Sequence, residues 1–187
     1  FDAMGLANNH TFDFGAIALH DSAAHLLGEE IEPVGVETPT RKACDPAFFS
    51  LSDGKRIALF AISDVDPTSS SQIGAASVRA NLGAAISNAR SHANLVVFLV
   101  HWGIENTEKI TDEQRELARW LVDRGVDLVV GSHSHCVQPL DFYHGRPIAY
   151  SLGNLVFDGA PTVESWNRGS LLEVGLNEGA RISSVSL

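Results

Sequence analysis

Short apolar runs alternate with segments of helical periodicity through the first two thirds of the chain. The runs that predict strands are residues 1–7, 31–36, 48–51, 56–62, 94–100 and 126–130. Apolar residues at helical spacing predict helices at 16–27, 78–92 and 111–124. Since strands that alternate with helices favour a helix-flanked sheet, this part of the chain predicts an α/β fold.

Turn and cap signals support several of these boundaries. Asp53 and Gly54 stand between two apolar runs, a strong hairpin signal. Gly28 ends the first helix, and Thr111 with Gln114 forms a capping box at the start of the third.

Hairpins dominate the last third of the chain. One is predicted over 141–149, around His144 and Gly145. The further strands expected here are 148–152, 155–157, 171–176 and 181–187. The order therefore predicts a sheet flanked by helices, with a second, more antiparallel sheet added. With no internal repeat or linker, residues 1–187 are predicted to form one domain.

Charge and composition narrow the class of partner. The formal net charge of −10 argues against a nucleic-acid partner. It does not exclude a phosphorylated substrate, because bound divalent cations would reverse the field locally. Cys44 and Cys136 form no CxxC motif, and the sequence does not decide whether they pair.

The chain starts at Phe1 and stops at Leu187, each inside a strand-like run, with no signal peptide and no membrane-length apolar run. We therefore expect a soluble piece of a longer parent, and the location of that parent stays open.

Polar residues that can bind metals follow three of the predicted strands. Asn9 and His10 come after the first strand, His101 follows 94–100, and a His-x-His pair follows 126–130. Sites in α/β folds gather at the carboxyl ends of strands, so we expect these three loops to converge. The alternative is a set of solvated loop histidines.

Together these residues would supply one amide oxygen and several neutral imidazoles, which suit Zn, Mn or Fe. The expected ligands are Asn9, His101, His133 and His135. A pair of such ions, about 3.5–4 Å apart, can clamp a phosphate and activate water. None of these ligands is anionic, and neither Asp64, Asp66 nor Asp158 has a strong claim. We expect the missing carboxylates to lie before Phe1.

His10 is better placed as a catalytic acid than as a ligand, because the side chains of adjacent residues diverge. Asp13, three residues on, could accept the second ring N–H of His10 and fix its tautomer. Asp13 could instead be a turn or cap residue.

Four ordered motifs carry a family resemblance that covers nearly the whole chain. They are ANNHTFDFG at 7–15, HWGIE at 101–105, GSHSHCVQP at 131–139 and YSLGNLVFD at 150–158. They resemble the ANNHxxDxG, HWGxE, GxHxHxxQ and YSLGNFxFD motifs of bacterial CapA-type proteins of capsule and poly-γ-glutamate synthesis.

That family is similar to the calcineurin-like metallophosphoesterases, so the resemblance implies a four-layer αββα sandwich with a two-metal site. It implies Asn9, His101 and His133 on one ion, His135 on the other, and His10 as the acid that protonates the leaving group. The family's amino-terminal Gly-Asp strand end and Asn-Leu-Glu segment are not found in the chain. They would supply the carboxylates, so the chain is expected to lack its amino-terminal strand or strands.

Three further residues are candidates for substrate contact or for support of the ligands: Asn8, Glu105 and Asn154. Glu105 either lines the cleft or faces water, and Asn154 stands where a polar turn is expected. Trp102 is expected to be a packing residue beside the site.

Two functions follow as expectations. The first is a metal-dependent hydrolase that acts on a phosphoester, an acyl phosphate or a poly-γ-glutamate-related substrate. The second is a non-catalytic metal-binding component of a membrane complex for polymer synthesis and export, with a membrane-anchored or cell-surface parent. A histidine-rich domain without a site is a third interpretation, which the four motifs disfavour.

Overall fold

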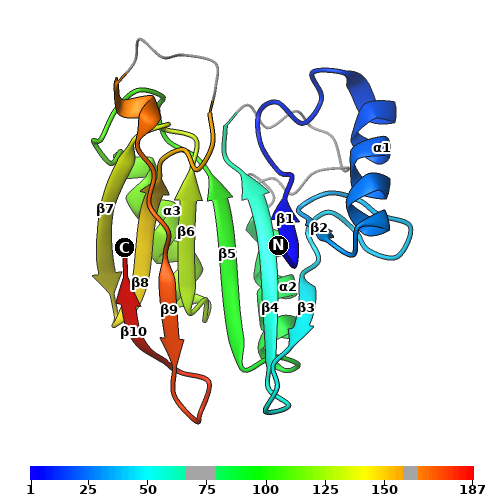
Figure 1. Ribbon diagram of the computed structural model, residues 1–187. Helices are drawn as coiled ribbons and strands as arrows, with labels where there is room; N and C mark the ends of the chain where they lie inside the picture. The colour runs from blue at the N-terminus through cyan, green and yellow to red at the C-terminus, as the bar shows by residue number, and fades with distance from the viewer. Residues whose placement is uncertain (66–78, 158–163) are drawn as a thin grey trace.

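The computed structural model describes residues 1–65, 79–157 and 164–187 (Figure 1). The helices are α1 (Gly15–Gly28), α2 (Arg79–Arg90), α3 (Asp112–Asp123) and the 3-10 helix η1 (Glu164–Asn167). The strands are β1 (Ala3–Gly5), β2 (Glu32–Val34), β3 (Ala47–Ser50), β4 (Arg56–Ser63), β5 (Leu95–His101), β6 (Leu128–Ser132), β7 (Val137–Tyr143), β8 (Arg146–Leu152), β9 (Glu173–Leu176) and β10 (Ile182–Ser186).

The centre of the molecule is a six-stranded sheet in the order β3-β4-β5-β6-β8-β7. The pairs β4–β5, β5–β6 and β6–β8 are parallel, whereas β3 and β7 pair antiparallel at the two edges. In this register His101 lies opposite both Ser63 and Ser132. The last residues of β4, β5 and β6 therefore lie together along the edge of the sheet formed by the carboxyl ends of these strands, at the top of Figure 1.

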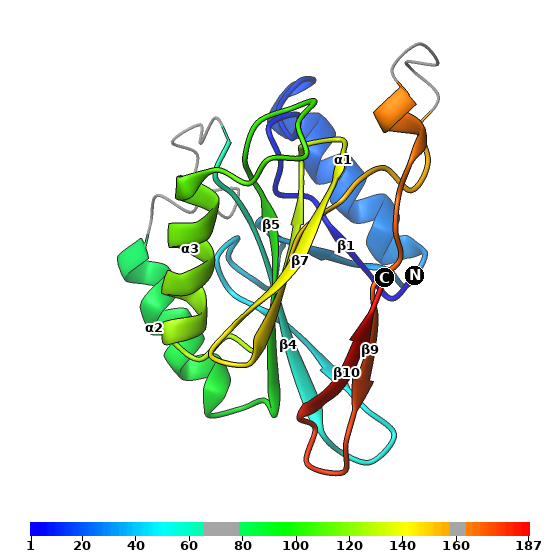
Figure 2. The same ribbon diagram turned by 90° about the vertical axis from the view of Figure 1, so that its left-hand side faces the viewer.

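Two helices cover one face of the sheet. Figure 2 shows α2 and α3 side by side on that face. Their apolar residues join the sheet in the largest buried cluster, which includes Phe60, Phe98 and Trp102. The apolar run of β5 is buried on both faces, as its sequence predicted.

Two small sheets cover the other face (Figure 2). β1 and β2 are parallel and pack on the central sheet through Val34 and Ala61. β9 and β10 are antiparallel, with Leu172, Val174 and other side chains against the same face. Helix α1 lies outside β1 and β2, where Leu19 contacts Val36. The layers are thus helices, sheet, small sheets and helix, which confirms the predicted αββα sandwich.

Two details of the predicted strands are wrong. Residues 155–157 form no strand, and Leu155 and Val156 are exposed. β7 begins at Val137, four residues earlier than expected, although Pro139 signals a loop. Pro is tolerated because β7 is an edge strand, where a missing N–H breaks no ladder.

Several smaller points complete the fold. Cys44 and Cys136 form no disulfide. Within the three described ranges, no helix is long and apolar enough to span a membrane. His20 and His25 are exposed on α1.

Candidate functional site

The three loops that carry the expected ligands meet at one edge of the central sheet. Asn9 and His10 lie on the loop after β1, His101 is the last residue of β5, and His133 and His135 follow β6. Because β5 and β6 are parallel neighbours, their carboxyl ends are adjacent. β1 lies over the face of the central sheet opposite α2 and α3. The loop after β1 therefore reaches the same edge as the carboxyl ends of β5 and β6.

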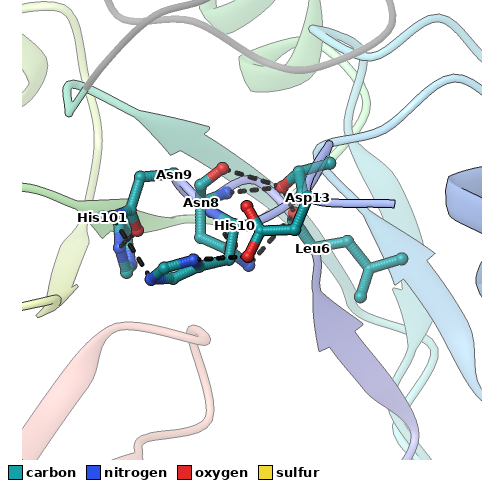
Figure 3. Close-up of polar contacts among 7 residues, drawn as sticks. Leu6, Asn8, Asn9, His10, Asp13 and His101 are labelled. Atoms are coloured by element: carbon teal, nitrogen blue, oxygen red, sulfur yellow. Dashed lines mark hydrogen bonds and ion pairs between the residues drawn. The ribbon is translucent and has the colours of Figure 1, made fainter. Parts of the chain in front are cut away.

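Asn9 and His101 contact each other across this site. His101 Nε2 lies 2.9 Å from Asn9 Oδ1, although the two residues are 92 positions apart (Figure 3). An amide oxygen only accepts, so Nε2 carries the ring proton and donates it. His101 Nδ1 then accepts from the hydroxyl of Ser132, at 3.0 Å. The motif analysis missed Ser132, and the signal for it lies in the strand register that puts it opposite His101.

The imidazole rings form a chain along this edge. The ring centroids of His101 and His133 are 4.6 Å apart, and those of His133 and His135 are 6.5 Å apart. His133 is buried and His135 is half-buried.

The His-x-His segment is held in a strained backbone conformation. His133 has φ 95° and His135 has φ 56°, in the left-handed region that side chains with a β-carbon avoid. The buried hydroxyl of Ser134 donates to the carbonyl of Cys136 (2.8 Å) and accepts from the N–H of the same residue (3.3 Å). The Asn106 N–H donates to the carbonyl of Ser134 (2.9 Å). Such strain, held in place by its surroundings, is typical of functional sites.

Burial favours the neutral form of His101 and His133. Burial first, and then the neighbouring charges of His133, His10 and His135, lower the pKa of His101 to about 3. Burial also lowers the pKa of His133, against the opposing effect of the Glu105 carboxylate. Neutral imidazole is the form that binds metal ions, so these rings are ready to act as ligands at neutral pH.

His10 faces the site from its solvent side. Its Nδ1 lies 2.8 Å from Asp13 Oδ2, and both side chains are largely exposed (Figure 3). Asn9 Nδ2 lies 3.5 Å from His10 Nε2. The second ring nitrogen of His10 therefore points toward Asn9 while the first is tied to Asp13.

Asn8 serves its own loop. Its Oδ1 accepts from the backbone N–H of His10 (2.8 Å), and its Nδ2 donates to the carbonyl of Leu6 (3.3 Å). The backbone carbonyl of Asn8 also accepts hydrogen bonds from the backbone N–H and the side-chain hydroxyl of Thr11. These contacts set the turn that presents Asn9 and His10.

Trp102 packs beside the site, in the core of the sheet. It is fully buried, and its indole N–H donates to the Tyr150 carbonyl at 2.8 Å. Gly131 passes so close that a β-carbon there would lie 1.9 Å from that carbonyl oxygen. This packing is the role that was expected of Trp102.

The candidate ligand atoms are of types that bind divalent cations, but none of them carries a negative charge. Within the described ranges, no group of three or more His, Cys, Asp or Glu side chains is placed to hold a metal ion. Glu105 is exposed, and the Asp13 carboxylate is engaged with His10. Asp64 lies at the same edge, where its backbone N–H donates to the His101 carbonyl (2.8 Å), whereas Asp66 and Asp158 fall outside the described residues.

There is space beside His101 for a further ligand. A cavity of about 220 Å³ opens next to it. The residues that line it include Asn8, His101, Ser132, Leu99 and Val130.

Known proteins are similar to this chain in sequence. A family model described as "Bacterial capsule synthesis protein PGA_cap" matches residues 1–159. The "PGA biosynthesis protein CapA" of Bacillus subtilis (strain 168) is 33% identical over 90% of this chain and 44% of its own length. The "Capsule biosynthesis protein CapA" of Bacillus anthracis is 32% identical over 90% of this chain and 42% of its own length.

A mycobacterial relative is more distant. The "Probable polyglutamine synthesis accessory protein Rv0574c" of Mycobacterium tuberculosis (strain ATCC 25618 / H37Rv) is 26% identical over 82% of this chain and 44% of its own length. The chain thus spans less than half the length of these relatives. Since the family model matches most of the chain and the four motifs occur in order, the chain belongs to the bacterial capsule synthesis protein PGA_cap family.

Proposed function

We propose that this chain is the cation-binding part of a protein that works in capsule or polyglutamate synthesis, with a hydrolase-type site at the edge described above. The observation that carries the proposal is the meeting of Asn9 and His101 at 2.9 Å, beside the ring of His133. A tautomer shift that moves the ring proton to Nδ1, where the Ser132 hydroxyl can accept it, would free Nε2 to share a cation with Asn9 Oδ1.

The names of the relatives support the biological setting. The two Bacillus relatives are named for PGA or capsule biosynthesis, and the mycobacterial one for polyglutamine synthesis. We extend that setting to the protein that contains this chain. A glutamate polymer or an acyl phosphate is anionic, and a chain with a net charge of −10 would repel it. A bound divalent cation reverses the field locally and removes that obstacle.

The proposed cation site needs carboxylates besides the residues described. Asn9, His101 and His133 would share one ion, and His135 would bind a second. We propose that the anionic ligands come from parts of the protein outside this chain, which matches 44% of the length of the Bacillus subtilis relative. Mn, Fe and Zn all suit this mixture of imidazole, amide and carboxylate.

His10 and Asp13 form the proposed acid. The carboxylate at 2.8 Å accepts from Nδ1–H of the ring and fixes the orientation of the imidazole. Nε2 lies 3.5 Å from the Asn9 amide nitrogen, and in the proposed reaction it would carry the proton that passes to a leaving oxygen held beside that residue. A positioned acid of this kind contributes about 10²–10⁴-fold to a rate.

A non-catalytic role in polymer binding is the second candidate. It is favoured by the lack, within the described ranges, of a complete group of anionic and imidazole ligands. In that role the cations would bridge the protein to a carboxylate polymer held by a synthesis and export complex at the membrane.

Turnover of the full-length protein that contains this chain separates the two candidates. With Mn²⁺ and p-nitrophenyl phosphate or acetyl phosphate, we expect turnover that falls about 10²-fold or more in His10→Ala, with Mn²⁺ affinity retained. His25→Ala is the matched control, because His25 also lies beside an aspartate, Asp21, but on the exposed side of α1. Tight Mn²⁺ binding without turnover would favour polymer binding, and no Mn²⁺ binding would remove both candidates.

A further inference from the structure

A closed ring of contacts surrounds His135 and joins four separate segments. His135 Nδ1 lies 2.9 Å from Asn154 Oδ1, and Asn154 Nδ2 donates to the backbone carbonyl of Trp166 at 3.0 Å. The indole N–H of Trp166 donates to Asn106 Oδ1. The backbone N–H of Asn106 returns to the carbonyl of Ser134, next to His135 (2.9 Å).

This ring of contacts decides the tautomer of His135. The Asn154 amide nitrogen is turned to the Trp166 carbonyl, so the amide oxygen must face His135. That oxygen only accepts, so Nδ1 of His135 carries the proton. The lone pair of the neutral ring then lies on Nε2, the nitrogen left without a partner in this ring of contacts.

Aromatic packing decides the plane of the same ring. The Trp166 indole stacks on His135 with centroids 4.4 Å apart and planes 24° apart. Phe157 meets His135 edge-on at 5.3 Å and Trp166 at 4.8 Å. With Nδ1 tethered and one face covered, rotation of the imidazole would break either the hydrogen bond or the stack.

The placement of Trp166 suits a role at the site better than a role in the core. Among the described residues, it belongs to none of the hydrophobic clusters that hold the sheets and helices together. Its neighbour Phe157 is 41% exposed. A half-buried indole outside the core therefore makes its main ring contacts with His135 and Phe157.

We propose that Trp166 is a positioning residue, which with Asn154 and Asn106 holds His135 in the Nδ1–H tautomer and aims Nε2 at a cation. The inference rests on the proposed function, in which His135 is a ligand. Residues that orient a ligating histidine typically change metal affinity by about 10–100-fold when removed.

The test is Mn²⁺ titration of the full-length protein by calorimetry, with ¹⁵N NMR of the imidazoles in the metal-free state. We expect Trp166→Ala to weaken Mn²⁺ binding about 10-fold or more, and Trp166→Phe, which keeps a stacking ring, to stay within about 3-fold. The wild type should show His135 protonated on Nδ1, and Asn154→Ala, which removes the acceptor, should give a mixture of tautomers. Trp120→Ala is the matched control, since Trp120 packs against the core and under Arg124, away from the site.

The outcomes distinguish this inference from the function on which it rests. Mn²⁺ binding by the wild type with unchanged affinity in Trp166→Ala would overturn the positioning role alone. A His135 ring protonated on Nε2 in the metal-free wild type would do the same. Absence of Mn²⁺ binding by the wild type would overturn both. Loss of affinity to the same degree in Trp120→Ala would mean a general loss of structure and would also refute the inference.

Discussion

The two ends of the central sheet handle buried polar groups in opposite ways. At the amino end of β6, Asp127 has 4% of its side chain exposed. Its carboxylate accepts from Arg90 (2.5 Å) and Arg146 (2.9 Å). The backbone N–H of Val96 completes the set at 2.8 Å. Both carboxylate oxygens are bonded and the charge is compensated.

At the carboxyl end of the same strand, the polar groups are neutral and strained. His101 and His133 lie side by side, both with a lowered pKa. His133 and His135 also hold left-handed backbone conformations. One end of the sheet is thus built for stability, and the other stores backbone strain, as binding sites do.

The largest effect is expected at the amino end. Asp127→Ala removes the acceptor of two arginines and of one backbone N–H, and we expect it to destabilise the fold by roughly 3 kcal/mol. Urea unfolding at pH 7 measures the change. Asp127→Asn keeps an acceptor and should lose less. Equal stabilities of the wild type and Asp127→Ala would break the comparison.

At the carboxyl end, the lowered pKa of His101 predicts that the stability of the fold depends on pH. The unfolded chain binds a proton at His101 near the ordinary histidine pKa of 6.5, whereas the folded chain, with the pKa lowered by burial, does so only near 3. Between these values the unfolded state holds more protons, so the free energy of unfolding rises with pH and falls on acidification. One such group contributes at most about 1.4 kcal/mol per pH unit.

Urea unfolding of the metal-free chain at pH 7.5, 6.5 and 5.5 checks this dependence. His101→Asn keeps a polar side chain without a proton to bind, so its stability should fall less over that range. If the free energy of unfolding of His101→Asn falls as steeply as that of the wild type, His101 is not the source of the pH dependence.

The smallest effect concerns backbone strain at His133. Both His133→Gly and His133→Ala remove the imidazole, but only alanine retains a β-carbon at φ 95°. We expect the glycine variant to be the more stable by about 1 kcal/mol, the reverse of the usual order of these residues. Thermal unfolding of the pair measures it. A more stable alanine variant would mean that the segment relaxes and stores no strain.

Much of the fold could be predicted from the sequence because its signals are local. The apolar run of β5, the capping box at Thr111 and the hairpin at Asp53 and Gly54 each depend on residues only a few positions apart. The strand predicted at 155–157 failed for the same reason, since an apolar run becomes a strand only where a partner strand is available. The motif residues could be found one loop at a time, and the predicted family is confirmed.

The contacts within the site came from the tertiary structure alone. The approach of Asn9 to His101 spans 92 residues, and the hydrogen bond from Trp166 to Asn106 spans 60. Such pairs are set by the order and register of β5 and β6 and by the layer in which β1 lies, which spacing along the chain does not encode. The sequence by itself therefore determined which residues have the chemistry of a site. Only the packing of the strands decided which of them meet, because a loop's position in space depends on the partner its strand takes in the sheet.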